Sequence, residues 1–229
     1  MADDSRVNAE TRPIDEIMNE TELGSFIMKY RTMIIAVVVG TAVLLSGFGI
    51  YNNIQGKNNQ EASAKIFAFD GAVYQKLIVG DVKAPEFATK LQALVVETSA
   101  FKGLVPMIIT SSDYLMGKGE LASAKIVLEE GQKNFASDNH YTAFLINSRL
   151  AVVYEDLGEL DSALAVLKDL SEQKTKFLAD KVYMDLGRIY LAKGDNEKAK
   201  LSLQYVVDKH GKSEFARIAR VLLEDIKGK

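Results

Sequence analysis

Apolar residues recur every three to four positions through most of the chain, which is the spacing of one face of an α-helix. The clearest example is a run of five residues, Leu160, Ala163, Leu164, Leu167 and Leu170, that share one helical face. Because this period dominates, and only three prolines interrupt it, we expect an all-α protein without strands.

Breaks in the pattern divide the soluble part, residues 61–229, into expected elements. A first helix over 60–79 places Ala62, Ile66, Phe69 and Val73 on one side, and a second runs from Pro85 to about Thr98, since proline favours the first turn of a helix. Three helical hairpins are expected at 104–133, 141–173 and 177–209. A last helix, 213–227, carries Phe215, Ile218, Ala219 and Leu222 and is expected to cap the stack.

Between Met33 and Tyr51 the periodic pattern gives way to an apolar run without a charged residue. Nineteen residues at 1.5 Å each nearly cross a hydrocarbon core of about 30 Å, and ten of them are Ile, Leu, Val or Phe, which favours insertion by about 3 to 6 kcal/mol. We therefore expect a transmembrane helix at 32–52 and a linker at 53–60. A cleaved signal peptide is the main alternative, but the run is longer than a signal core and 32 residues precede it.

The formal net charge of −3 is distributed unevenly. Residues 1–31 carry seven acidic and four basic side chains, and we expect them to form a mostly disordered tail. Lys29 and Arg31 precede the apolar run, and only Lys57 follows closely, so the positive-inside rule places the N-terminus in the cytoplasm. Residues 57–229 carry 24 charges of each sign. This balance lacks the basic face that phosphate binding needs, so we expect no nucleic-acid partner.

Two further features of composition bear on sites and partners. The chain has no cysteine, which excludes disulfides, thiolate metal sites, cysteine nucleophiles and lipid-modified cysteines. Small residues four positions apart in the apolar run, Ala36 with Gly40 and Ala42 with Ser46, would allow close helix contact and self-association through the membrane.

Three stretches of the soluble part share one pattern: LMGKGELASAKIVL from Leu115, YEDLGELDSALAVL from Tyr154 and YLAKGDNEKAKLSL from Tyr190. In each, a large residue is followed by a glycine four positions later and by an alanine five positions after that. The glycines are Gly119, Gly158 and Gly194, and the alanines are Ala124, Ala163 and Ala199. A period of 36 to 39 residues indicates an array of helical hairpins, with glycine at the turn and alanine where two helices approach closely.

The repeated unit resembles the tetratricopeptide repeat. Tyr154 and Tyr190 match its middle aromatic residue, and Ala151 and Gly187 match the small residue three positions earlier. The usual tryptophan and terminal proline are absent, and the first copy has Leu115 in place of the aromatic residue. The resemblance implies a tetratricopeptide-like helical-hairpin solenoid, and the apolar run adds one N-terminal transmembrane helix before it.

The whole layout resembles the ancillary Sec-translocon subunit family, which are single-pass proteins of the bacterial inner membrane. The most specific stretch is SRLAVVYEDLGELDSALAVL followed by MDLGRIYLAKGDNEKAKLSL. This resemblance implies a cytoplasmic N-terminus, a periplasmic repeat domain, and translocon subunits, periplasmic chaperones or exported chains as partners.

Four carboxylates crowd around Gly158, but they lack the order of oxygen ligands found in a calcium loop. The sister copies carry lysines there, so we interpret these carboxylates as a solvated hairpin tip. His140 and His210 have no nearby ligand pair. The run HGKS at 210–213 lacks the glycine and the preceding strand of a phosphate loop, which favours a helix cap at Ser213. We expect no enzyme activity, no metal and no cofactor.

Tetratricopeptide arrays bind partners on the concave face that is lined by the first helix of each hairpin. Matching the repeats places six residues on this face, with packing against a neighbouring helix as the alternative: Ser148, Val152, Glu155, Met184, Arg188 and Leu191. These expectations describe a membrane-tethered interaction protein that links exported chains to chaperones beside the Sec translocon. A scaffold for envelope assembly or cell division, and a holdase for unfolded chains, are the alternatives.

Overall fold

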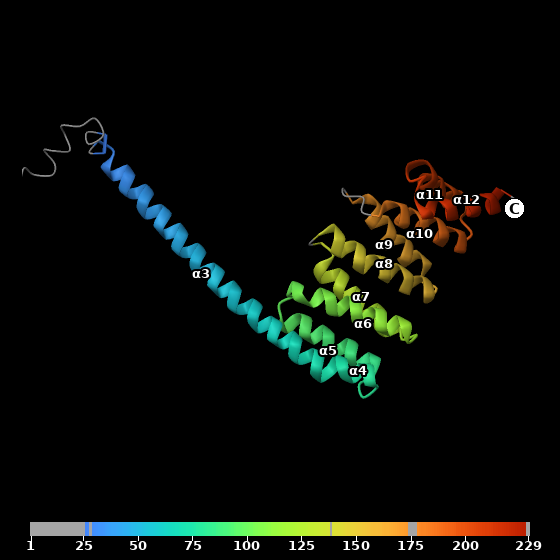
Figure 1. The fold of residues 1–229 in the computed structure, drawn as a ribbon, viewed down its shortest axis with the longest axis horizontal. Coiled ribbons are helices and arrows are strands. Elements are labelled where there is room, and N and C mark those ends of the chain that lie inside the picture. Colours follow the sequence, from blue (N-terminus) through green and yellow to red (C-terminus); the bar gives the residue numbers. More distant parts are fainter. Residues whose placement is uncertain (1–25, 28, 138, 174–177, 228–229) are drawn as a thin grey trace, which may run out of the picture. The chain divides into compact units, whose positions relative to one another are not determined.

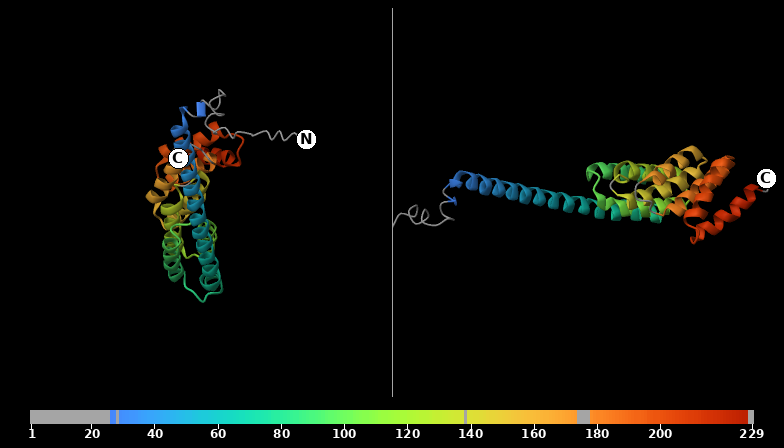
Figure 2. Two further views of the ribbon diagram at one scale, coloured as in Figure 1. Left: turned by 90° about the vertical axis from the view of Figure 1, so that its left-hand side faces the viewer. Right: turned by 90° about the horizontal axis from the view of Figure 1, so that it is seen from above.

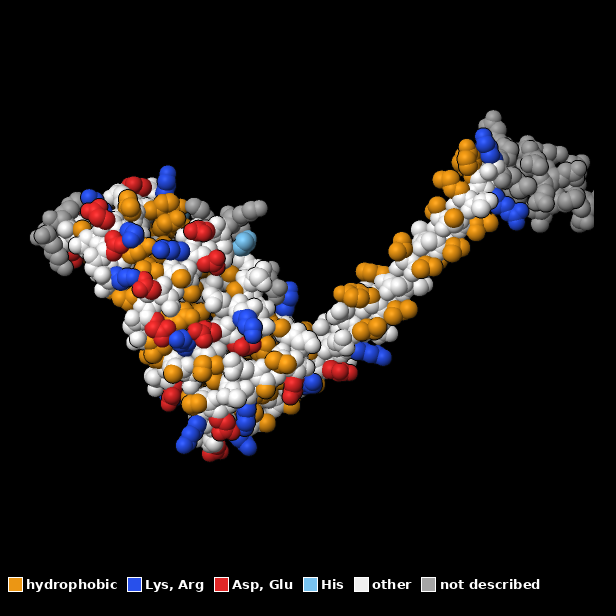
Figure 3. All heavy atoms as spheres, turned by 180° about the vertical axis from the view of Figure 1, so that it is seen from behind, with side chains coloured by type: hydrophobic (Ala, Val, Ile, Leu, Met, Phe, Trp, Pro, Cys, Tyr) orange, Lys and Arg blue, Asp and Glu red, His pale blue; other side chains and the backbone are white. Residues whose placement is uncertain are grey.

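The computed structural model describes residues 26–27, 29–137, 139–173 and 178–227, and its chain divides into two compact units, 1–58 and 59–229. Most of the expected tail, 1–31, lies outside the described residues. Within the described part, one helix is long and apolar enough to cross a membrane by length and composition. This helix is α3, Arg31–Phe69, and Figure 3 shows apolar side chains along its visible face.

Residues 53–60, which we expected to form a linker, are helical and belong to α3. The segment is polar but contains no proline and only one glycine, so nothing in it prevents the helix from continuing. The Ser63 hydroxyl also donates to the carbonyl of Asn59, at 2.8 Å, as serine does inside a helix.

In the second unit the chain is helical throughout its regular elements, and no strand occurs among the described residues. From residue 105 onward, consecutive helices pack on one another in chain order (Figures 1 and 2). After a π-helical turn, Asp70–Tyr74, come α4 (Gln75–Val79), α5 (Ala84–Glu97), α6 (Val105–Gly117), α7 (Leu121–Phe135), α8 (His140–Asp156), α9 (Leu160–Glu172), α10 (Ala179–Ala192), α11 (Asn196–Lys209) and α12 (Glu214–Lys227). The all-α solenoid predicted from the repeats is therefore confirmed.

The three hairpins close with the same turn. Gly119, Gly158 and Gly194 each have a positive φ, between 75° and 79°. The residue after each glycine donates its N–H to a carbonyl five residues earlier, on Leu115, Tyr154 and Tyr190, at 2.7 to 2.9 Å. This is the Schellman arrangement, which satisfies carbonyls at a helix end and needs a left-handed residue that glycine supplies at least cost.

Alanine lies where the two helices of a hairpin meet most closely. Ala124, Ala163 and Ala199 are fully buried. In the third hairpin the approach is so close that a Cβ on Gly187 of α10 would lie 2.6 Å from Leu203 of α11. A larger side chain at these positions would separate the helices, because protein interiors are densely packed.

The structure adds a hairpin that the sequence pattern did not reveal. The end of α3, the π-helical turn and α4 fold back on α5. Three aromatic rings fill the space between them, with the ring centroids of Phe69 and Tyr74 each 5.8 Å from that of Phe87. The two helices expected at 60–79 and 85–98 thus form the first layer of the same stack.

The last helix buries a slightly different face from the one expected. Ala216, Ala219 and Leu223 of α12 are buried against α10 and α11, whereas Ile218 remains 43% exposed. Phe215 and Leu222 are partly buried at the edge of the same cluster, so three of the four expected residues contact it.

Replacing Gly158 by alanine should destabilise the protein by about 1 to 2 kcal/mol, the cost of placing a side chain in the left-handed region. Space is not the cause, because a Cβ at Gly158 would meet nothing within 4 Å. Gly117→Ala is the matched control, since Gly117 is helical and equally open, and it should be neutral or stabilising. Equal thermal unfolding of the two variants in detergent would contradict the turn assignment.

Replacing Ala163 by glutamate should cost about 3 kcal/mol or more, because overpacking and an unpaired buried charge act together. Ala165, two residues later on α9, is exposed, so Ala165→Glu should change stability by less than about 0.5 kcal/mol. The measurement is denaturant unfolding of the full chain in micelles. The register of the second hairpin is wrong if Ala163→Glu unfolds at the same denaturant concentration as the parent.

Candidate functional site

The acidic turn between α8 and α9 contacts the hairpins on both sides of it. The Lys125 ammonium of α7 lies 2.8 Å from the Glu159 carboxylate. On the other side, Lys193 pairs with Asp161 and thereby lowers the pKa of that carboxyl. Both pairs join neighbouring hairpins. The interpretation as a solvated hairpin tip holds, with the addition that its carboxylates help to align the repeats.

Tyr154, which sets the register of the second copy, contacts two side chains of α7 in the preceding hairpin. Its hydroxyl donates to the Glu129 carboxylate at 2.8 Å, and the Lys125 ammonium lies 5.3 Å from its ring centroid. Burial, together with the bond to Glu129, raises the pKa of the Tyr154 phenol to about 12. The phenol therefore stays neutral across the physiological range and serves packing rather than acid/base chemistry.

Two of the six residues expected on the concave face pair with each other. The Arg188 guanidinium of α10 donates to the Glu155 carboxylate of α8 and lies 3.6 Å from the Asp185 carboxylate on its own helix. The bond to Glu155 raises the pKa of Arg188 above its already high ordinary value. This pair joins the first helices of consecutive hairpins, and it partly neutralises the charge on this face.

The other four expected residues lie in different surroundings. Ser148 and Val152 are half-buried on α8, so each presents part of its surface to solvent. Met184 is buried among residues of α11 and α12, and Leu191 packs against the edge of the same cluster. The structure thus brings Glu155 and Arg188 together, leaves Ser148 and Val152 partly accessible, and places Met184 in the core of the C-terminal cap.

A second ion pair follows the same design one repeat earlier. Arg149 of α8 makes a two-pronged contact with the Asp113 carboxylate of α6, at 2.7 and 3.0 Å. In both pairs the carboxylate belongs to the first helix of one hairpin, and the arginine belongs to the first helix of the next hairpin. Parallel hydrogen bonds of this kind fix the relative position of the two helices. Sequence reasoning missed the Asp113–Arg149 pair, because the two residues lie at different repeat positions, six before Gly119 and nine before Gly158.

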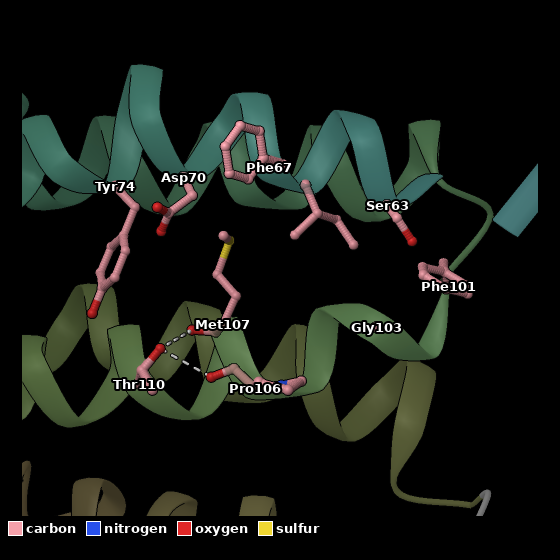
Figure 4. Close-up of a pocket in the computed structure, with 10 residues that line it drawn as sticks. Ser63, Phe67, Asp70, Tyr74, Phe101, Gly103, Pro106, Met107 and Thr110 are labelled. Carbon is pink, nitrogen blue, oxygen red and sulfur yellow. Dashed lines mark hydrogen bonds between the residues drawn. The ribbon is translucent and has the colours of Figure 1, made fainter. Parts of the chain in front are cut away.

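An open cavity lies one layer further toward the N-terminus. A cavity of about 450 Å³ separates the end of α3 from α6 (Figure 4). One wall presents Phe67, Asp70 and Tyr74, and the other presents Pro106 and Thr110. The sequence pattern gave no indication of this cavity, because the hairpin that forms its first wall was not recognised as part of the repeat.

In the described part of the chain, no group of three or more acidic or histidine side chains could hold a metal ion. The HGKS segment, with Lys209, lines an open cavity of about 450 Å³. His140 contacts the side-chain oxygen of Gln173 at 3.1 Å. Ser213 accepts from the N–H of Phe215 at 3.1 Å and donates to Asp180 at 2.6 Å. Ser213 is therefore the N-terminal cap of α12, as expected.

Comparison with known proteins agrees with this arrangement. A family model described as a tetratricopeptide repeat-like domain matches residues 25–228, which is most of the chain. No curated protein and no solved structure matches. Tetratricopeptide repeat-like domains bind other proteins, and the observed stack of helical hairpins fits such a domain. On the extent of the family match, the chain belongs to the tetratricopeptide repeat-like domain family.

Proposed function

We propose that this protein is a scaffold anchored in the bacterial inner membrane, with its repeat domain in the periplasm, where it works beside the Sec translocon and links exported chains to chaperones. The observation that carries the proposal is the combination, in one chain, of a single apolar helix with a stack of interaction repeats. A tethered domain meets membrane partners at high effective concentration, so weak contacts are sufficient. The choice of the translocon follows from the resemblance of residues 148–203 and the overall layout to the ancillary subunit family.

The open cavity beside Phe67 supports a second candidate, a holdase that binds unfolded chains directly. Phe67 is 83% exposed, and exposed aromatic side chains at a cavity are typical of binding surfaces for apolar segments. A scaffold for envelope assembly or cell division would use the same repeats with different partners. The identity of the bound proteins distinguishes these functions.

Photocrosslinking from Val152 in intact membranes tests the proposal. A benzoylphenylalanine placed at this partly accessible position on α8 should form products with translocon subunits, periplasmic chaperones or exported chains. Lys200, exposed on α11, is the matched control position and should give few products. Products with envelope or division proteins would favour the alternative scaffold, and many unrelated chains would favour the holdase. Equal yields at Val152 and Lys200 would contradict binding on the face of the first helices.

The orientation is tested with single cysteines, since the chain has none of its own. Lys200→Cys should react with a membrane-impermeant thiol reagent in cells whose outer membrane has been permeabilised. Ser5→Cys, on the other side of the apolar helix, should react only after the inner membrane is broken. The reverse pattern of labelling would place the repeat domain in the cytoplasm.

A further inference from the structure

The cavity between α3 and α6 is a groove whose walls are two helices of successive layers (Figure 4). On α3 and the π-helical turn its lining residues run from Ser63 to Tyr74, a length of about 16 Å at 1.5 Å per residue. This length accommodates about three turns of a helix or about five residues of extended chain. A π-helical turn lies in the wall itself, and such turns are frequent at functional sites.

The apolar part of the groove is accessible to a partner. Phe67 on α3 is 83% exposed, and Pro106 at the start of α6 is exposed on the opposite wall. Met107 is almost fully buried and forms the floor. A flexible methionine beside rigid aromatic and proline rings can adapt to side chains of different shape.

Asp70 is the only charged residue among those that line the groove. Its carboxylate accepts a bond from the Gln75 amide at 3.3 Å, and no lysine or arginine among the described residues pairs with it. On the facing wall, the Thr110 hydroxyl donates to the carbonyls of Pro106 and Met107 on its own helix, at 3.0 and 3.3 Å. A half-buried carboxylate therefore faces the groove without a cation.

The first helices of the later layers are joined by ion pairs, and the contact between α3 and α6 has no such pair. Between α6 and α8, Arg149 meets Asp113, and between α8 and α10, Arg188 meets Glu155. In each, the later helix supplies an arginine to a carboxylate of the earlier helix. Between α3 and α6 the carboxylate is present as Asp70, but the later helix supplies no cation and the space between the helices is open.

We propose that this groove binds an amphipathic polypeptide segment of a partner protein. The segment places an apolar side chain against Phe67 and Pro106 and a lysine or arginine against Asp70, so that the partner completes the ion pair that the fold completes elsewhere. An anionic ligand is disfavoured, since Asp70 would repel it and no lining residue carries a positive charge. The proposal rests on the function above, that the domain binds proteins, and it specifies the chemistry of the bound segment.

Model peptides test this directly on the full chain in detergent micelles. Each peptide has three helical turns with leucines at positions i, i+3 and i+7 and one central residue, either lysine, glutamine or glutamate. Fluorescence anisotropy should show the lysine peptide binding about tenfold more tightly than the glutamate peptide, as a charge-assisted hydrogen bond implies. Asp70→Asn should remove this preference, and Asp70→Lys should reverse it in favour of the glutamate peptide.

Matched variants separate the groove from general effects. Asp81 is an exposed carboxylate outside the groove, so Asp81→Asn should leave the preference unchanged. Phe67→Ala should weaken all the peptides about tenfold, through loss of apolar contact. Val96 is similarly exposed, at 77%, but does not line the groove, and Val96→Ala should have no effect. Comparing protein variants with one peptide cancels the partition of that peptide into micelles.

Three results would overturn the proposal: equal binding of the lysine and glutamate peptides, equal effects of Asp70→Asn and Asp81→Asn, or no saturable binding of any peptide up to about 1 mM. These outcomes are independent of the crosslinking from Val152. If crosslinking from Val152 yields export proteins but peptide binding does not depend on Asp70, only the groove assignment fails. If the preference for the lysine peptide depends on Asp70 but crosslinking from Val152 yields no export protein, the translocon assignment fails and the groove assignment is retained.

Discussion

The close contact between the two helices of each hairpin is the constraint on which the rest of the solenoid depends. It requires a left-handed glycine at the turn and a side chain no larger than alanine where the helices meet, and both requirements are met in three successive copies. A single hairpin leaves one face apolar, so it gains stability only by packing on its neighbours. A substitution at one of these glycines or alanines would shift the two helices of its hairpin. That shift would also disturb the contacts between layers, where the functional surface is formed.

Contacts between layers use residues that vary from copy to copy. Glu159 pairs with the preceding hairpin, whereas Asp161 and Glu155 pair with the following one. Exposed ion pairs, such as the one between Asp161 and Lys193, contribute little stability by themselves. Their effect is on geometry, because a guanidinium held by a carboxylate fixes how two first helices lie against each other. The acidic turn is therefore a means of aligning repeats, and its charges need no catalytic explanation.

Features that recur in each hairpin could be predicted from the sequence, whereas features that occur only once could not. The all-α class and the glycine turns could be predicted because Gly158 and its equivalents recur with a fixed partner alanine. The first hairpin could not, since its core is built from Phe69, Tyr74 and Phe87 rather than from the repeat residues. For the candidate site, the repeat register predicts that Glu155 and Arg188 lie on the first helices of consecutive hairpins, but their pairing depends on how α8 and α10 pack in the folded chain. The burial of Met184 depends on α12, which follows the last repeat and has no counterpart between the others.

The departure of the first hairpin from the repeat pattern also explains why the groove lies beside it. Aromatic rings separate α3 from α5, whereas alanine allows close contact in the later hairpins, so the first layer is built on a wider spacing. An arginine on α6 could still have reached across to Asp70, as Arg149 reaches Asp113, but threonine and proline are found there. Wide spacing without a closing ion pair leaves an apolar channel with one carboxylate in it. The aromatic packing that sets this hairpin apart from the glycine and alanine pattern of the later repeats therefore makes it the layer best suited to receive a segment of another protein.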